Sequence, residues 1–355
     1  MNTTEITVPL SDQGLLALQR NADEISREVT DSYFKMHPEC YRSNPHKIRA
    51  MCKVDFNHHL KFLASAMITA TPEIFVEYTM WLKDVLQSRL LSLQHPIDSF
   101  ALMLQFIKLR LNESDQLIAT QVIEAGLDAL KKERPNKSNS QYLSEKSKNV
   151  SPDYTLSLVE GDRKQAENII RNSTESGVSL IDVEVGIVQP AMYDIGHLWQ
   201  QNKITVAQEH LATAISQNAL ARAFATADFA DPVDRSTICA CIEGNFHSMG
   251  LRMVSDAFEL SGWDVDYLGA DTPNSSIVSQ VDAVRPDVLS LSLSLPHQII
   301  VLKQLLEQLQ AEMGSQMPSI VVGGLAFNNH KSLSSRVDVD NWYIDAKAVM
   351  DDIKK

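Results

Sequence analysis

The 355-residue sequence lacks the long apolar run that a membrane-spanning helix requires. Its first residues, Met1-Asn-Thr-Thr-Glu, contain neither the basic nor the apolar region of a secretion signal. Both absences predict a cytoplasmic protein that does not interact with a membrane.

Cysteine is scarce as well, with four in the chain. Cys239 and Cys241 alternate on a predicted buried strand, while Cys40 and Cys52 lie far from them in the sequence. This spacing forms neither a disulfide framework nor a zinc-binding pattern. We expect reduced thiols with mainly structural roles.

Positive charge is limited: 32 Lys and Arg stand against 45 Asp and Glu, which gives a net charge of −13. Proteins bind duplex nucleic acid through clusters of Lys and Arg that face the phosphates. The N-terminal region also has no pattern of a helix-turn-helix with a basic recognition helix. The sequence therefore predicts no direct binding of nucleic acid.

The sequence does contain a predicted loop that could bind a ligand. It comprises residues 243–250, between an apolar run at 237–242 and a helical pattern that begins near Leu251. A loop that leaves the carboxyl end of a strand is where open α/β sheets bind ligands. His247 in this loop is a candidate general base, a metal ligand, or a loop histidine bonded to nearby backbone.

Three more short apolar runs follow, each separated from the next by a segment of helical length: residues 263–269, 287–295 and 319–324. This alternation predicts a doubly wound parallel sheet. We expect the sheet domain to span residues 235–355.

The loop resembles the Asp-x-His-x-x-Gly signature of cobalamin-binding domains that displace the nucleotide base and ligate cobalt through the histidine. The positions that correspond to the motifs of this family are Asn245, His247, Gly250, either Ser292 or Ser294, Gly323 and Gly324. The resemblance implies that His247 is the lower axial ligand of cobalt. Asn245 replaces the Asp of the family and can accept a hydrogen bond but supplies no charge, so we expect a weaker ligand unless Glu243 approaches.

Residues 151–230 return to helical periodicity and fit a bundle of four helices. Within it, Trp199 is followed after nine residues by Glu209 and His210. This spacing resembles the helical cap of CarH-type photoreceptors, which use adenosylcobalamin as their chromophore. The resemblance covers residues 154–355 and implies that Trp199 lies against the adenosyl group, Glu209 hydrogen-bonds to it and His210 sits beside it. The alternative is a core Trp with a capping Glu-His pair.

One departure concerns the residue after the Trp. CarH-type photoreceptors have a His there that takes the upper cobalt position after illumination, and this chain has Gln200. A bis-His photoproduct through this residue is therefore excluded, which leaves His210 or water as the alternatives for the upper position.

Residues 1–132 are predicted to be an all-helical domain, joined to the bundle by a polar linker at 133–150. The domain contains five histidines: His37, His46, His58, His59 and His95. They are either ordinary surface and core residues, or they surround a planar tetrapyrrole among globin-like helices. The whole architecture resembles the photocobilins, which pair cobalamin with a bilin such as biliverdin.

Two functions follow from these resemblances. The first is a light-responsive signalling protein, not an enzyme, in which breakage of the Co–C bond changes domain packing or oligomeric state; a homo-oligomer and a downstream signalling protein are expected. The alternative is a corrinoid carrier of a methyltransferase system. A carrier must expose a small methyl group, whereas Trp199 and Glu209 are suited to enclose a nucleoside, which favours the signalling protein.

Overall fold

A computed structural model describes residues 8–38, 45–132 and 152–353. The chain divides into two compact units, Met1–Arg134 and Pro135–Lys355. The predicted linker at 133–150 and Cys40 lie outside the described residues. Within the described ranges, no helix combines the length and the apolar character needed to cross a membrane.

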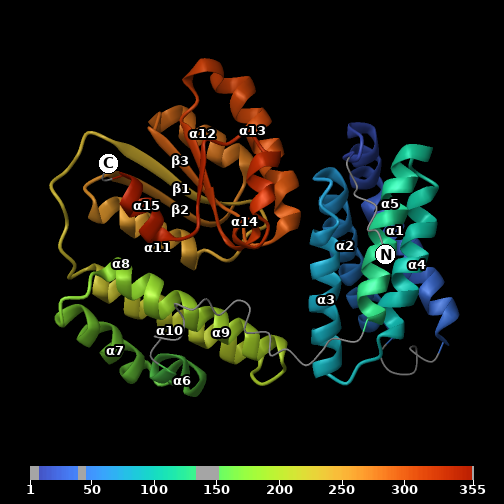
Figure 1. The fold of residues 1–355 in the computed structure, drawn as a ribbon, viewed down its shortest axis with the longest axis horizontal. Coiled ribbons are helices and arrows are strands. Elements are labelled where there is room, and N and C mark those ends of the chain that lie inside the picture. The colour runs from blue at the N-terminus through green and yellow to red at the C-terminus, as the bar shows by residue number, and fades with distance from the viewer. Residues whose placement is uncertain (1–7, 39–44, 133–151, 354–355) are drawn as a thin grey trace. The chain divides into compact units, whose positions relative to one another are not determined.

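The first unit is all helical in its described part (Figure 1). Its helices are α1 (Asp12–Met36), α2 (Pro45–Ile68), α3 (Glu73–Ser88), α4 (Gln94–Lys108) and α5 (Glu113–Lys131). The side chain of Ser11 caps α1 by accepting the Gly14 N–H, and that of Asn112 caps α5 by accepting the Asp115 N–H. The apolar stripe expected along α2 is buried: Phe56, Leu60, Leu63 and Met67. Helical periodicity therefore predicted this unit correctly.

The second unit begins with a helical bundle, which we call the cap. Its elements are α6 (Pro152–Glu160), α7 (Arg163–Glu175), α8 (Leu180–Val183), a π-helical turn (Glu184–Val188), α9 (Gln189–Gln200) and α10 (Val206–Phe224). The π-turn ends just before Pro190, which has no N–H and whose ring would collide with the carbonyl four residues earlier in an α-helix. Widening the helix by one residue relieves that conflict.

The cap is followed by a parallel sheet of five strands within the described residues. These are β1 (Ser236–Ile242), β2 (Asp264–Thr272), β3 (Val288–Ser292), β4 (Ser319–Gly323) and β5 (Asn341–Tyr343), in the spatial order β2-β1-β3-β4-β5. The helices between and after them are α11 (Met249–Leu260), α12 (Asn274–Val284), α13 (Ile299–Met313), α14 (Leu325–Asn329) and α15 (Ala346–Ile353). The predicted doubly wound parallel sheet is confirmed, and the strand order reverses between β1 and β3.

The cap and the sheet domain share one apolar core. Figure 1 shows α11 and α15 on the side of the sheet that faces the cap, and α12 and α13 on the other side. Met253 and Ala257 of α11 and Ala346 of α15 belong to the same buried cluster as Val183 and Ile195 of the cap. This shared core fixes the cap next to the loop that follows β1.

Candidate functional site

The loop after β1 lies where the strand order reverses, and Asn245 anchors it. Asn245 is fully buried; its Nδ2 donates to the Ser292 carbonyl at the end of β3 (2.8 Å), and its Oδ1 accepts the backbone N–H of His247 (3.2 Å). The backbone N–H of Asp271, at the end of β2, donates to the Asn245 carbonyl (2.9 Å). Asn245 thus joins three strand ends through both its backbone and its amide. The predicted bond between Asn245 and the imidazole of His247 stays a prediction.

Gln298 forms a second brace that sequence reasoning missed. Its buried side chain donates to the Gly244 carbonyl (2.8 Å) and accepts the backbone N–H groups of Ser294 (2.9 Å) and Leu295 (3.0 Å). One amide therefore holds the loop after β1 against the loop after β3. A polar residue among apolar neighbours was its only signal in the sequence.

His247 belongs to this braced loop. The residue is exposed, yet the protein atoms around the ring remove enough water to lower the pKa of His247, which the negative charge of Glu209 on α10 partly offsets. A neutral imidazole offers a nitrogen lone pair to a metal, whereas an imidazolium does not. The structure thus brings His247 of the sheet domain and Glu209 of the cap together.

The predicted cap residues differ in their surroundings. Trp199 is half-buried at the end of α9 and packs against the cap core. The carboxylate of Glu209 accepts from Thr213 Oγ1 (3.2 Å) and pairs with Nδ1 of His210 (2.6 Å), whose side chain is 75% exposed. Glu209 is therefore held by its own helix, while His210 stands largely in solvent.

The glycines of the predicted site serve different purposes. Gly324 has φ +101°, and a Cβ there would lie 2.2 Å from the Leu293 carbonyl oxygen, so the protein's own backbone requires this glycine. A Cβ on Gly323 would lie 3.2 Å from the Tyr343 carbonyl oxygen, which is tight. A Cβ on Gly250 would meet no atom within 4 Å. Only Gly250 leaves open space for a ligand to approach the backbone.

The residues fit a cobalt corrinoid, whose ring carries amide groups around its edge. At the carboxyl edge of the sheet, His247 offers a ring nitrogen with a lowered pKa, and Gly250 leaves free space beside its backbone. Beside it, Thr272 Oγ1 and Asn274 Oδ1 are buried with no hydrogen-bond partner among the described residues. Such oxygens are rare in folded proteins and suit the N–H donors of a bound amide.

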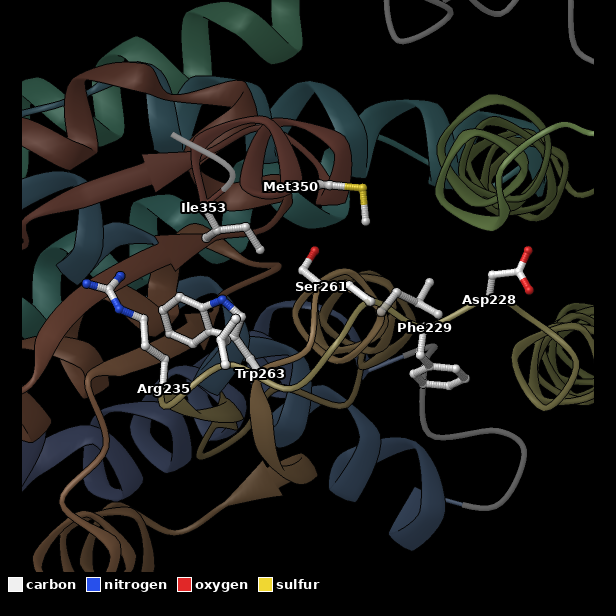
Figure 2. Close-up of a pocket in the computed structure, with 10 residues that line it drawn as sticks. Asp228, Phe229, Arg235, Ser261, Trp263, Met350 and Ile353 are labelled. Atoms are coloured by element: carbon white, nitrogen blue, oxygen red, sulfur yellow. The ribbon is translucent and has the colours of Figure 1, made fainter.

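A cavity lies elsewhere in the sheet domain. It has a volume of about 770 Å³ and opens beside Arg235 and Trp263, which precede β1 and β2, at the amino edge of the sheet (Figure 2). The Arg235 guanidinium lies 5.3 Å from the centre of the Trp263 ring. The loop that bears His247 is at the opposite, carboxyl edge, so this cavity is not part of the candidate site.

Comparison with known proteins gives two family matches. Residues 235–345 match a model of the B12 binding domain, and residues 152–223 match a second B12 binding domain model. The HTH-type transcriptional repressor CarA of Myxococcus xanthus is 28% identical over 179 residues, which is 50% of this chain and 57% of CarA. CarH of the same organism, another HTH-type transcriptional repressor, is 30% identical over 155 residues, 43% of this chain and 50% of CarH.

The chain therefore spans about half the length of these curated relatives. A solved structure, the monomethylamine corrinoid protein of Methanosarcina barkeri, is similar with a TM-score of 0.49 and 16% identity; the match covers 56% of this chain and 94% of that one.

These relatives correct one prediction. The net charge predicted no direct binding of nucleic acid, but both relatives are HTH-type transcriptional repressors, so that exclusion was wrong. The physical reason is that net charge sums over a whole chain, whereas binding to phosphates depends on where the Lys and Arg side chains cluster.

Proposed function

We propose that the chain is a light-responsive signalling protein that uses adenosylcobalamin, because residues 152–223 and 235–345 match B12 binding domain models and about half of the chain is similar to CarA and CarH. The observation that supports this most is that Glu209 on the cap lies near enough to His247 on the sheet domain for its charge to act on the imidazole. A carrier has no need of a polar cap residue opposite its metal ligand. Two of the matched relatives, CarA and CarH, are transcriptional repressors, which points the same way.

Each residue would have a distinct task. His247 would present a neutral nitrogen to the lower face of cobalt, on a loop that Asn245 and Gln298 hold in place. Glu209 would accept hydrogen bonds from the hydroxyls of the nucleoside, and Trp199 would supply a flat apolar surface. Adenosylcobalamin, when bound, supplies a Co–C bond that visible light can break.

The alternative, a corrinoid carrier, requires a methyl group that a second protein can reach. The two functions differ in the ligand that the cap prefers. A carboxylate placed for a nucleoside loses that partner when only a methyl group is present, so a sensor should bind adenosylcobalamin more tightly than methylcobalamin.

A bilin such as biliverdin in the first unit is a separate proposal. It is supported by an aromatic stack near the surface: Phe62 lies on Tyr78 with 4.0 Å between ring centres, and Trp81, which is 38% exposed, stacks on the same tyrosine. His58 stands exposed on α2 one turn before Phe62. Incubation of the full chain with biliverdin should give a red-shifted band that stays with the protein on a column. A column-purified protein without such a band would rule the proposal out.

The decisive experiment measures absorption spectra and affinities of the full chain with adenosylcobalamin and with methylcobalamin. In darkness we expect the spectrum of nitrogen-ligated adenosylcobalamin, and green light should convert it to that of a cobalamin without the adenosyl group. Trp199→Ala should narrow the preference for the adenosyl form, whereas Trp81→Ala, in the first unit, should leave it unchanged. Equal affinity of the unmodified chain for both forms would instead support the carrier.

A further inference from the structure

Two carboxyl groups meet inside the core that the cap shares with the sheet domain. Glu184, in the π-turn of the cap, is fully buried, and Asp256, on α11, is 1% exposed. Among the described residues, no backbone N–H, amide or hydroxyl group donates a hydrogen bond to either oxygen of Glu184. Asp256 is close enough for its charge and its carboxyl group to act on Glu184. A proton on Glu184 would give the two carboxyl groups a hydrogen bond.

A shared proton resolves this arrangement. Burial raises the pKa of Glu184 well above its usual range, and the neighbouring charge of Asp256 raises it further. Burial also raises the pKa of Asp256, but Arg252, whose Nε lies 2.6 Å from Asp256 Oδ1, opposes that rise. Glu184 thus carries the proton and donates it to the Asp256 carboxylate, which Arg252 neutralises.

Arg252 extends this contact to further elements. Its guanidinium lies 5.1 Å from the centre of the Phe224 ring at the end of α10, and 5.4 Å from that of Tyr267 on β2. The first turns of α11 therefore contact the cap at two places, the π-turn and the end of α10. The same helix begins two residues after His247.

We propose that Glu184 and Asp256 form a proton-dependent latch that holds the cap on the sheet domain. The latch requires no cofactor, so it adds control by pH to the control by light proposed above. Loss of the shared proton leaves two buried carboxylates facing each other, and their repulsion and desolvation favour separation of the cap.

Other charged or titratable groups also lie near the latch. On α11, Glu259 lies near enough for its charge to raise the pKa of Asp256. Tyr267 on β2 and Cys239 on β1 have pKa values raised by burial, that of Cys239 to about 12. On α15, Lys347 pairs with Asp182 of α8 at an exposed edge of the same interface. The charge of Glu209 on the cap also acts on His247, whose pKa is lowered from 6.5, so the carboxyl pair is identified by comparing the unmodified chain with variants of Glu184 and Asp256.

The direction of the effect follows from proton linkage. In the closed state the pKa of Glu184 is raised, and in an open state it returns toward its ordinary value of 4.5. Closure is then strongest below that value and weakens as the pH rises toward the closed-state pKa. The ratio of closed to open chains should fall by up to about tenfold for each pH unit in this range.

The test is hydrogen exchange of residues 180–188 in the full chain without cobalamin, at pH values from 5.5 to 8.5 and corrected for intrinsic exchange. Protection in the unmodified chain should fall as the pH rises. Glu184→Gln keeps a donor for Asp256 but cannot ionise, so its protection should be nearly independent of pH and at least about tenfold higher than that of the unmodified chain at pH 8.5.

Two further variants make the result unambiguous. Asp182→Asn removes the exposed ion pair of the same interface and should keep the pH dependence of the unmodified chain. Asp256→Asn removes the second charge and should reduce that dependence, which provides an answer if Glu184→Gln does not fold. Equal pH dependence in the unmodified chain and in either latch variant would overturn the proposal. Because no cobalamin is present, failure of the proposed light response would not affect this outcome.

Discussion

Replacement of His247 by Ala is expected to remove nitrogen ligation below cobalt, because the loop after β1 would then present no imidazole. Cobalamin bound to His247→Ala should show the absorption spectrum of a water-ligated lower face, or bind weakly. His210→Ala is the matched control, since that histidine is largely exposed on the cap. A nitrogen-ligated spectrum that is unchanged in His247→Ala would show that the ligand has been assigned wrongly.

Asn245 provides a second prediction at the scale of one residue. Its Nδ2 donates to the Ser292 carbonyl in a buried site. Asn245→Asp would restore the residue type of the family, yet an ionised carboxylate cannot donate and would face that carbonyl. We expect the free energy of unfolding to fall by about 1–3 kcal/mol at pH 7.

The loss caused by Asn245→Asp should shrink as the pH is lowered, because a protonated Asp can donate again and a raised folded-state pKa stabilises the fold at low pH. Urea unfolding of the chain without cofactor at pH 5 and pH 7 measures this. Asn245→Ser, which can donate but is too short to reach, should lose stability equally at both pH values.

Sequence motifs could single out His247 and Glu209 as candidates because both residues lie at recognisable spacings in ordinary loops and helices. They could not identify Gln298 or Glu184. A Gln or Glu in a helical pattern is normally solvated, and only the tertiary contacts reveal that these two are buried. The apolar residues on both sides of Glu184, at 183 and 185, were a weak signal of its burial.

At the scale of elements, Gly324 and Gly250 should respond in opposite ways to replacement by Ala. Gly324→Ala combines a left-handed φ with a collision against the Leu293 carbonyl and should cost at least about 1 kcal/mol of stability. Gly250→Ala lies in the first turn of α11 with free space around it and should stabilise the chain by up to about 1 kcal/mol.

Gly250→Ala should nevertheless weaken cobalamin binding if the cofactor approaches this turn. Thermal unfolding without cofactor and a cobalamin titration separate the two effects. A gain in stability with unchanged affinity would remove Gly250 from the site.

The buried histidine of α2 predicts how the first unit responds to acid. Burial lowers the pKa of His59 to about 3, and its Nδ1 pairs with the Tyr78 hydroxyl at 2.6 Å. Since the folded-state pKa lies below the ordinary 6.5, the neutral ring stabilises the fold above pH 6.5, and this contribution is lost as the pH falls toward 3.

Hydrogen exchange of α2 at pH 4 and pH 7 checks this expectation. His59→Gln keeps an acceptor for Tyr78 and should reduce the acid sensitivity, while His46→Gln, at an exposed position of the same helix, should not. Equal acid sensitivity of the unmodified chain and His59→Gln would contradict the expectation.

Periodicity predicted most of the elements, and the exceptions have physical causes. β1, β3 and β4 are buried apolar runs that stand out in the sequence. β5 has three residues, Asn341–Tyr343, too few to show any alternation. The π-turn was also missed, because its residues have the same apolar pattern as an α-helix and only Pro190 marks the conflict.

At the scale of the whole molecule, we expect loss of the adenosyl group to change cap packing or oligomeric state. The group would fill space beside Trp199 and Glu209, and an emptied apolar space costs roughly 2–5 kcal/mol in cores. Sliding of the cap over α11 would relieve that cost. Because Gln200 offers no imidazole to the freed cobalt face, rebinding of fresh adenosylcobalamin should be easier than in chains with a His there.

Scattering and size-exclusion profiles of the adenosylcobalamin-loaded chain, in darkness and after complete photolysis, measure this change. The chain loaded with hydroxocobalamin has no Co–C bond and should give one profile under both conditions. Identical profiles for the adenosylcobalamin form would mean that its light reaction has no structural output.

The π-turn at Glu184–Val188 joins α8 and α9 into one continuous helical segment, and it sets the rotation of α8 relative to α9. An α-helix advances roughly 100° per residue, and the extra residue of a π-turn shifts every side chain before it by one such step relative to every side chain after it. The direction of Glu184 toward α11 is therefore not tied by regular α-helical spacing to the direction of Trp199. In a chain one residue shorter here, the same two side chains would occupy a single helical frame and could not both keep their present directions.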